Sequence, residues 1–372
     1  MNRALKFRIY PTTEQKELLT KTFGCCRLMY NKFLAQSRQE YETEHLPFSY
    51  SRCAHEMKEL KKEMTFLREV DSIALQQSLR HLQRAYENFF AQEGRGFPRF
   101  KSRHASMQSY TTVYVNNNIR LEGNTLRLPK IGKVKVRRHR DTPAGWKLKS
   151  VTVSMESTGT YFASILYEYE QPENQRHNID KDSAKILGID FAMHGLAVFS
   201  DGNRADYPMY YRHAQERLAR EQRKLSHCVP GSKNYGKQKK RIARRHEKIR
   251  NQRKDFLHKL SRRIADSFDA AAMEDIDMKA MSQGMHFGKS VMDNGNGVFR
   301  NMLRYKLEEQ GKELIVVDRF YPSSKRCSVC GNVKTELRLS ERIYRCSCGN
   351  CMDRDVNAAV NIREEGRRIL AA

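Results

Sequence analysis

Five cysteines crowd between residues 327 and 351 of this 372-residue chain, and they limit its fold more than any other feature. Cys327 and Cys330 form a C-x2-C pair, and after fifteen intervening residues comes a C-x-C pair, Cys346 and Cys348. Two cysteine pairs on facing turns make a tetrahedral thiolate site for zinc, and four thiolates leave no open position for hydrolysis. The spacing therefore predicts a zinc ribbon with one structural Zn²⁺.

The second pair departs from the C-x2-C spacing, which leaves an alternative. Cys348 with Cys351 would restore that spacing, but Cys346 would then have no role. Gly349 directly follows Cys348, as a tight turn requires, so we assign Cys346 and Cys348 as ligands and leave Cys351 free. The remaining four cysteines are scattered, which suits reduced thiols and one metal site better than a secreted disulfide framework.

Charge is the second constraint. The chain has 69 Lys and Arg against 43 Asp and Glu, a formal net charge of +26, so a polyanion such as nucleic acid is the expected partner. Residues 237–263 form a predicted amphipathic helix with thirteen Lys or Arg and two acids, and such like charges repel unless phosphates neutralise them.

We find no apolar run of the roughly 18 residues that span a membrane and no signal-peptide core, so we expect no membrane partner and a cytoplasmic location.

The order of predicted elements indicates several parts. Thr12 and Gln15 predict a capping box at the start of a first helix, and further helices are predicted over 51–66 and 72–90. Short β-rich runs follow from Gln108, and the opening "ALKFRIYP" alternates like a strand that joins them in a small barrel. After a linker at 171–184, strands and helices alternate as in a layered α/β domain.

Acids stand where predicted strands end. Asp190 closes "ILGID", and Glu274 and Asp275 close "AAAMED". A carboxylate at the rim of a core costs on the order of several kcal/mol if it stays charged and unpaired, so it needs a partner or a metal. "DRDVNAAVNI" predicts a helix preceded by Asp353 and Asp355, and either aspartate can be its N-cap.

Four segments resemble the RuvC-type nuclease domain of the TnpB family, namely "GIDFAMHGLAVFSDG", "MEDIDMKAM", "FYPSSKRCSVCG" and "CGNCMDRDVNAAVNI". This family comprises RNA-guided DNA endonucleases of insertion-sequence transposons, related to type V CRISPR effectors. The resemblance extends to the first half of the chain through "FRIYPTTEQ", "MYNKFL", "ALQQSLRHLQRAYENFF", "GFPRFK" and "VNNNIRL". It therefore covers nearly the whole chain.

The resemblance implies an RNase H-like fold whose acidic triad falls on Asp190, Glu274 and Asp355. The family's last catalytic aspartate directly precedes "VNAA", which selects Asp355 over Asp353. Three carboxylates brought together repel one another, and divalent metal relieves this repulsion. Two Mg²⁺ ions about 3.5–4 Å apart would activate a water and stabilise the leaving oxygen in phosphodiester hydrolysis.

The expected fold class is multidomain, α+β followed by α/β. A helical recognition domain is inserted in a small β-barrel wedge domain, and an RNase H-like RuvC nuclease domain with an inserted zinc ribbon follows. The predicted boundaries are 1–10 and 104–180 for the barrel, 11–103 for the helical domain, 181–321 and 350–372 for the nuclease domain, and 322–349 for the zinc ribbon.

The resemblance also implies the partners. A guide RNA from the transposon end pairs with one strand of the target double-stranded DNA, while the protein reads a short flanking motif. By alignment, Tyr50 and Gln76 fall where family members contact that motif, with Asn116 nearby. The alternative, a nuclease-inactive RNA-guided repressor, should have lost at least one of the three acids, and all three are present.

Overall fold

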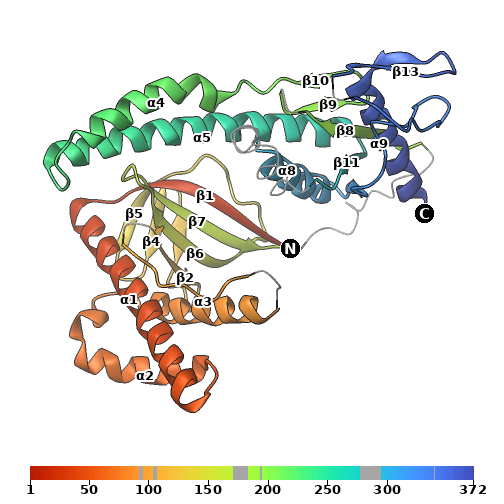
Figure 1. Cartoon of the computed structure of the whole chain (residues 1–372). Coiled ribbons are helices and arrows are strands. Elements are labelled where there is room, and N and C mark those ends of the chain that lie inside the picture. Colours follow the sequence, from red (N-terminus) through yellow and green to blue (C-terminus); the bar gives the residue numbers. More distant parts are fainter. Residues whose placement is uncertain (92–94, 104–106, 171–182, 193–194, 277–294, 339) are drawn as a thin grey trace. The chain divides into compact units, whose positions relative to one another are not determined.

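The computed structural model describes the chain except for residues 92–94, 104–106, 171–182, 193–194, 277–294 and 339 (Figure 1). Two compact units are present, Met1–Gln171 and Pro172–Ala372. The predicted linker at 171–184 lies, up to residue 182, outside the described residues. Among the helices described, none has a stretch long and apolar enough to cross a membrane.

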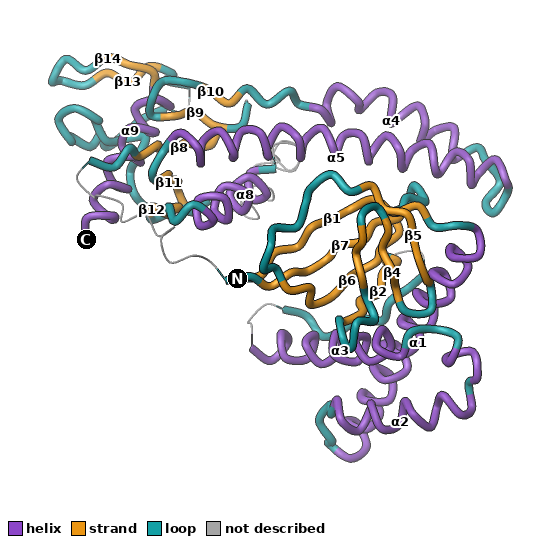
Figure 2. The backbone as a smooth tube through the Cα atoms, turned by 180° about the vertical axis from the view of Figure 1, so that it is seen from behind, coloured by secondary structure: helices purple, strands orange, loops and turns teal. Residues whose placement is uncertain are grey.

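The first unit contains a seven-stranded antiparallel sheet, curved into half a barrel, with the strand order β2-β6-β7-β1-β5-β4-β3 (Figure 2). The first strand lies in the middle of this sheet and pairs with β7 and β5, as its alternating pattern predicts. The strands are β1 Asn2–Tyr10, β2 Gln108–Val113, β3 Arg120–Glu122, β4 Thr125–Leu128, β5 Gly132–Arg137, β6 Lys147–Met155 and β7 Tyr161–Glu168.

Helices occupy the sequence between β1 and β2. They are α1 Thr13–Glu44, α2 Tyr50–Glu63, the 3-10 helix η1 Thr65–Arg68 and α3 Ser72–Ala91. Thr12 caps α1 and forms the predicted capping box with Gln15. The helix predicted over 51–66 ends earlier, at Glu63, because Met64 leaves the helical backbone angles (φ −98°, ψ 80°).

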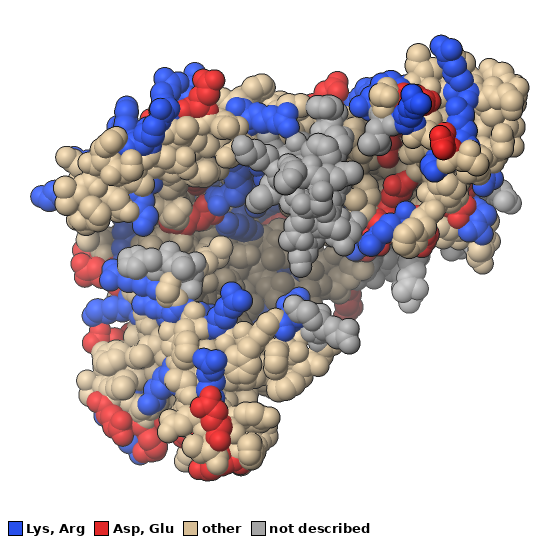
Figure 3. All heavy atoms as spheres, in the orientation of Figure 1, with Lys and Arg blue, Asp and Glu red and all other residues tan. Residues whose placement is uncertain are grey.

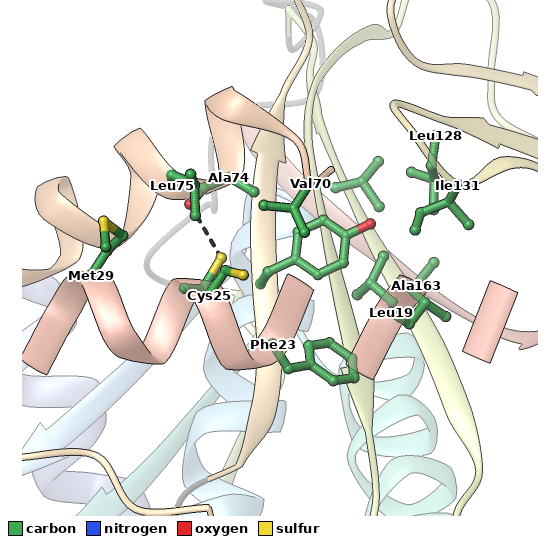
Figure 4. Packing of buried hydrophobic residues seen from close by; sticks show 14 of the residues in the cluster. Leu19, Phe23, Cys25, Met29, Val70, Ala74, Leu75, Leu128, Ile131 and Ala163 are labelled. Atoms are coloured by element: carbon green, nitrogen blue, oxygen red, sulfur yellow. Dashed lines mark hydrogen bonds between the residues drawn. The ribbon is translucent and has the colours of Figure 1, made fainter. Parts of the chain in front are cut away.

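One apolar core joins these helices to the sheet. Leu19 and Phe23 of α1 and Leu75 of α3 are buried together with Leu128 and Ala163 of the sheet (Figure 4). Because helix and sheet residues share this core, the inserted helices and the half-barrel form one packed body.

The second unit is built on a mixed five-stranded sheet with the order β10-β9-β8-β11-β12. Three neighbouring strands, β8, β11 and β12, run parallel, whereas β9 pairs antiparallel with both β8 and β10. The strands are β8 Ile186–Phe191, β9 Ala197–Phe199, β10 Arg204–Ala205, β11 Ala270–Glu274 and β12 Glu313–Val317, with a separate hairpin of β13 Ile343–Arg345 and β14 Cys351–Asp353. The helices are α4 Tyr210–Ser226, α5 Lys233–Ser267, α8 Asn296–Glu309 and α9 Arg354–Ala371.

Helices cover both faces of this sheet (Figure 1). On β8, Leu187 and Ile189 belong to an apolar cluster with α5 and α8, whereas Ile186 belongs to a cluster with α9. On β11, Ala270 and Ala272 also belong to the α9 cluster. The central strands are thus sandwiched between α5 and α8 on one face and α9 on the other, which is the predicted layered α/β arrangement.

Candidate active site and zinc centre

Two of the predicted acids, Asp190 and Glu274, stand at the C-terminal ends of neighbouring parallel strands in the central sheet. Ile189 of β8 is in register with Met273 of the parallel neighbour β11, so Asp190 and Glu274 occupy the next position on each strand. Neighbouring strands lie about 4.8 Å apart. Ile186 of β8 and Ala272 of β11 pack on α9. Asp190 is four residues after Ile186, and Glu274 is two residues after Ala272. Because side chains alternate between the two faces of a strand, both acids point to the α9 face.

The third acid comes from the first turn of α9. Asp353 is the N-cap of this helix, and its carboxylate accepts hydrogen bonds of 3.0 Å from the backbone N–H groups of Asp355 and Val356. The same carboxylate pairs with Arg204 at 2.8 Å. Asp353 therefore fills the capping role that the sequence left open between the two aspartates, and Asp355 lies inside the helix, 3.4 Å from the guanidinium of Arg354.

The helix α9 approaches the sheet closely at two glycines. A Cβ atom on Gly188 would lie 2.0 Å from the carbonyl oxygen of Ala359, and one on Gly366 would lie 2.4 Å from Cβ of Ala272. Only glycine fits at such distances. This close approach holds the first turn of α9, with Asp355, against the ends of β8 and β11.

The charges of Glu274 and Asp355 act on the buried carboxyl group of Asp190. Burial, and then the charges of Glu274 and Asp355, raise the pKa of Asp190 well above its ordinary value, while Arg354 opposes the rise. Burial also raises the pKa of Glu274, although a hydrogen bond from the Ser323 hydroxyl opposes it. Charged carboxylates are therefore costly here without a cation.

The fourth acid of this region is separate from the three. Asp275, next to Glu274, forms ion pairs with Arg300 at 2.8 Å and Arg319 at 3.6 Å. Its charge is thus balanced by two arginines. Among the neighbouring acids, Glu274 and then Asp355 contribute most to the raised pKa of Asp190.

The predicted zinc ligands lie together. Four sulfur atoms all lie within 4.8 Å of one another, those of Cys327, Cys330, Cys346 and Cys348. Each pair sits on a tight turn, since the N–H of Gly331 donates to the carbonyl of Cys327 (3.0 Å) and the N–H of Gly349 donates to that of Cys346 (3.1 Å). Four thiolate donors in this arrangement fit a structural zinc. Within the described part of the chain these cysteines are the one group of His, Cys, Asp or Glu side chains that meets this criterion.

Polar neighbours favour the thiolate form of Cys327 in this centre. Burial raises the pKa of Cys327, but hydrogen bonds from the backbone of Cys330, the side chain of Asn350 and the backbone of Val329 outweigh it and lower the pKa to about 6. Cys351 lies on β14, exposed and outside the group. The geometry thus favours Cys346 over Cys351 as the fourth ligand.

The three residues predicted to contact a DNA motif belong to the first unit. The guanidinium of Arg80 lies 4.5 Å from the ring centre of Tyr50, the first residue of α2. Gln76 is exposed on α3, one turn before Arg80, so Tyr50 and Gln76 share one side of the α2–α3 pair. Asn116 is exposed in the turn after β2, with a left-handed φ of 50°.

The helices α4 and α5 carry a basic surface, and Lys and Arg side chains project along this hairpin in Figure 3. The predicted apolar stripe of α5 is buried at Ile249, Leu257 and Leu260, whereas most Lys and Arg of 237–263 are exposed. Between the helices, Gln238 donates to the carboxylate of Glu221 at 2.7 Å. The hairpin thus presents an extended cationic face to solvent.

Three family models match the chain. Residues 164–285 match OrfB_IS605, described as "Probable transposase", and residues 297–362 match the Cas12f1-like TNB domain, which spans the four-cysteine group and the first half of α9. Residues 1–45 match HTH_OrfB_IS605, described as a helix-turn-helix domain. In the structure these residues form β1 and one continuous helix, α1.

Curated relatives match almost end to end. A protein of Streptomyces pristinaespiralis, named as an RNA-guided DNA endonuclease, is 37% identical over 369 residues, which are 98% of this chain and 90% of the relative. The chain belongs to the TnpB family. A second TnpB-family relative, the RNA-guided DNA endonuclease InsQ of Escherichia coli K12, is 32% identical over 99% of this chain and 93% of its own length.

The fold agrees with TnpB membership. A structure titled Cas12f1-sgRNA-target DNA complex superimposes with a TM-score of 0.56 over 98% of each chain, at 13% identity. At this identity the likeness concerns the fold alone. It confirms the predicted class, α+β followed by α/β with a zinc ribbon. The predicted small barrel is, in the structure, a sheet curved into half a barrel.

Sequence reasoning missed three polar residues of this region. Ser323 contacts Glu274, and Asn357 and Asn361 of α9 bind the segment around the first cysteine pair. A signal for the asparagines was available, because they stand four residues apart on the apolar side of the predicted helix. Nothing local indicated that Ser323 would reach Glu274.

Proposed function

We propose that this TnpB-family protein is an RNA-guided DNA endonuclease of an insertion-sequence transposon that cuts double-stranded DNA beside a short flanking motif. The observation that carries the proposal is that Asp190 is buried at the end of β8 beside Glu274, where the charges of Glu274 and Asp355 act on it. Relatives that match nearly the whole chain and bear the name RNA-guided DNA endonuclease support it.

The three acids fit divalent metal of the Mg²⁺ type. Carboxylate oxygens suit Mg²⁺ and Mn²⁺, and the raised pKa of Asp190 reflects crowded negative charge that a cation would relieve. Asp190, Glu274 and Asp355 would hold this metal, which would supply activation of the attacking water and stabilisation of the leaving oxygen of the scissile phosphodiester.

The residues of the chain have distinct tasks in this proposal. Asp190 and Glu274 hold metal from adjacent strand ends, and Asp355 closes the site from the start of α9. The arrangement corresponds to a RuvC-type centre. Asp353 keeps Asp355 in place by capping the helix.

We assign recognition of the partners to other surfaces. The exposed Lys and Arg of α4 and α5 suit the phosphates of guide RNA or target DNA. Tyr50, Gln76 and Asn116 are assigned to the flanking motif. In this division the wedge (1–10 and 104–180) and helical (11–103) parts recognise nucleic acid together with the basic face of α4 and α5. The nuclease part, residues 181–321 and 350–372, carries that face and also cuts the DNA, and the zinc ribbon 322–349 holds one Zn²⁺ at its four cysteines.

The nuclease-inactive repressor is disfavoured. Such a protein has no need of the acidic triad, and here all three acids are present and crowded together. A single experiment separates the two functions, because a repressor binds its target and leaves it intact.

The test uses the protein purified with its own RNA. The RNA is sequenced, its guide segment is replaced by one that matches a plasmid target, and a mismatched guide is the control. We expect linear plasmid only with the matched guide, the flanking motif and Mg²⁺, and none after addition of EDTA. Tight binding of the matched target in Mg²⁺ without any cut would favour the repressor.

A further inference from the structure

Ser323 lies between β12 and the first cysteine pair and touches the proposed nuclease centre. It is only 4% exposed, and its hydroxyl donates a hydrogen bond to Oε1 of Glu274. A buried hydroxyl needs a partner. Here the partner is one of the three acids assigned to metal binding.

Two asparagines of α9 hold the segment that carries Ser323. The side-chain amide of Asn361 donates to the carbonyl of Ser323 at 2.8 Å and to that of Arg326 at 2.6 Å. Asn357 donates to the same Arg326 carbonyl at 2.7 Å and accepts from the N–H of Ser328 at 3.0 Å. Both asparagines are buried, so these bonds are shielded from water.

The bonds connect the two metal centres through one short segment. Its N-terminal end presents the Ser323 hydroxyl to Glu274, and its C-terminal end supplies Cys327 and Cys330 to the zinc group. The helix that clamps the segment also carries Asp355. The placement of Glu274 relative to Asp355 therefore depends on this clamp as well as on the sheet.

We propose that Ser323 is a positioning residue for Glu274, held by Asn357 and Asn361, and that it fixes which carboxylate oxygen faces the metal. This inference rests on the proposed function, because it requires Glu274 to be a metal ligand. A ligating carboxylate whose other oxygen is fixed by a hydrogen bond is oriented in advance, and loss of such a partner costs about 10–100-fold in metal affinity or activity.

The experiment compares Ser323→Ala with Ser324→Ala in the full-length protein–RNA complex. Ser324 is the exposed neighbour and supplies the same chemical change as a control. Bound Mn²⁺ is measured by electron paramagnetic resonance without DNA. We expect Ser323→Ala to bind Mn²⁺ roughly tenfold more weakly and to need correspondingly more Mn²⁺ for half-maximal cutting, while its zinc content and DNA binding match those of Ser324→Ala.

Further variants keep the comparison decisive. Ser323→Thr retains the hydroxyl and should recover part of the Mn²⁺ affinity. Ser323→Cys keeps nearly the same volume with a much weaker donor, and it replaces Ser323→Ala if that variant does not fold. Equal Mn²⁺ affinity in the Ser323 and Ser324 variants would overturn the positioning role.

Glu274→Gln distinguishes this inference from the proposed function. If Glu274→Gln abolishes cutting and Ser323→Ala behaves like Ser324→Ala, only the positioning role is wrong. If Glu274→Gln cuts normally, the proposed active site is wrong, and the positioning role is overturned with it.

Discussion

Gly188→Ala tests whether the close approach of α9 to the sheet places Asp355. A Cβ atom at residue 188 would lie 2.0 Å from the carbonyl oxygen of Ala359 and 2.8 Å from the backbone nitrogen of Arg363. Both are backbone atoms of α9, so rotation of a side chain cannot relieve either contact. Real Cβ contacts essentially never fall below 3.0 Å, and the helix must therefore shift by about 1 Å or more.

Such a shift has consequences for both stability and chemistry. Overpacking of this kind costs about 1–3 kcal/mol in the free energy of unfolding. A misplacement of about 1 Å in a catalytic group can slow the reaction about 100-fold. We therefore expect Gly188→Ala to be moderately less stable and to cut at least tenfold more slowly, with binding of RNA and target DNA retained.

The assay combines urea unfolding with single-turnover cleavage by the protein–RNA complex. Gly236→Ala in α5 is the matched control, because no atom lies within 4 Å of its added Cβ. In a helix this change should stabilise by about 0.5–1 kcal/mol and leave cutting intact. Wild-type stability together with a wild-type cleavage rate for Gly188→Ala would refute the proposed role of the close approach.

Three further predictions concern single side chains. Asp353→Ala removes the cap of α9 and should cost about 1 kcal/mol in the free energy of unfolding, yet the variant should still cut in Mg²⁺; complete loss of cutting would make Asp353 a metal ligand. Because the pKa of Asp190 is raised, the wild type loses stability as the pH rises through that pKa, so without divalent metal Asp190→Asn should melt at a higher temperature than wild type at pH 7. The difference should shrink as the pH falls and vanish well below about pH 4, where the carboxyl group is protonated in both states, and a wild type that melts higher at pH 7 would contradict it. Elemental analysis should show zinc lost in Cys346→Ser and kept in Cys351→Ser, and the reverse result would reinstate the alternative ligand pair.

Features set by local spacing could be predicted from the sequence. The cysteine pairs needed only the turns at Gly331 and Gly349, and the four sulfurs lie together in the structure. An apolar strand that ends in an acid predicted Asp190 and Glu274 at strand ends. The parallel register of β8 and β11 then makes them neighbours.

The choice between the two late aspartates required more than local spacing. Both Asp353 and Asp355 precede or begin a helix, and either type of position favours aspartate. The backbone of α9 settles the cap, because the N–H groups of Asp355 and Val356 point to the carboxylate of Asp353. From the residues alone, the two positions were equivalent.

Long-range contacts could not be predicted at all. Ser323 meets Glu274, and the backbone of α9 fits over Gly188, only after the sheet and α9 have packed. The hydrophobic periodicity of the sequence does not reveal such pairs, since each contact depends on the tertiary arrangement of segments far apart in sequence. The end of α2 at Glu63 was also not predicted, because the apolar pattern of the sequence continues past the last residue of the helix.

Cleavage of matched double-stranded DNA by Asp190→Ala tests the central claim most directly. The variant and the wild type are loaded with the same guide RNA, and binding and cutting of one labelled target are measured in Mg²⁺. We predict that the variant binds the target like the wild type and does not cut it, because one of three metal-binding acids is lost. If Asp190→Ala cuts as fast as the wild type, the cluster of Asp190, Glu274 and Asp355 is not the nuclease centre.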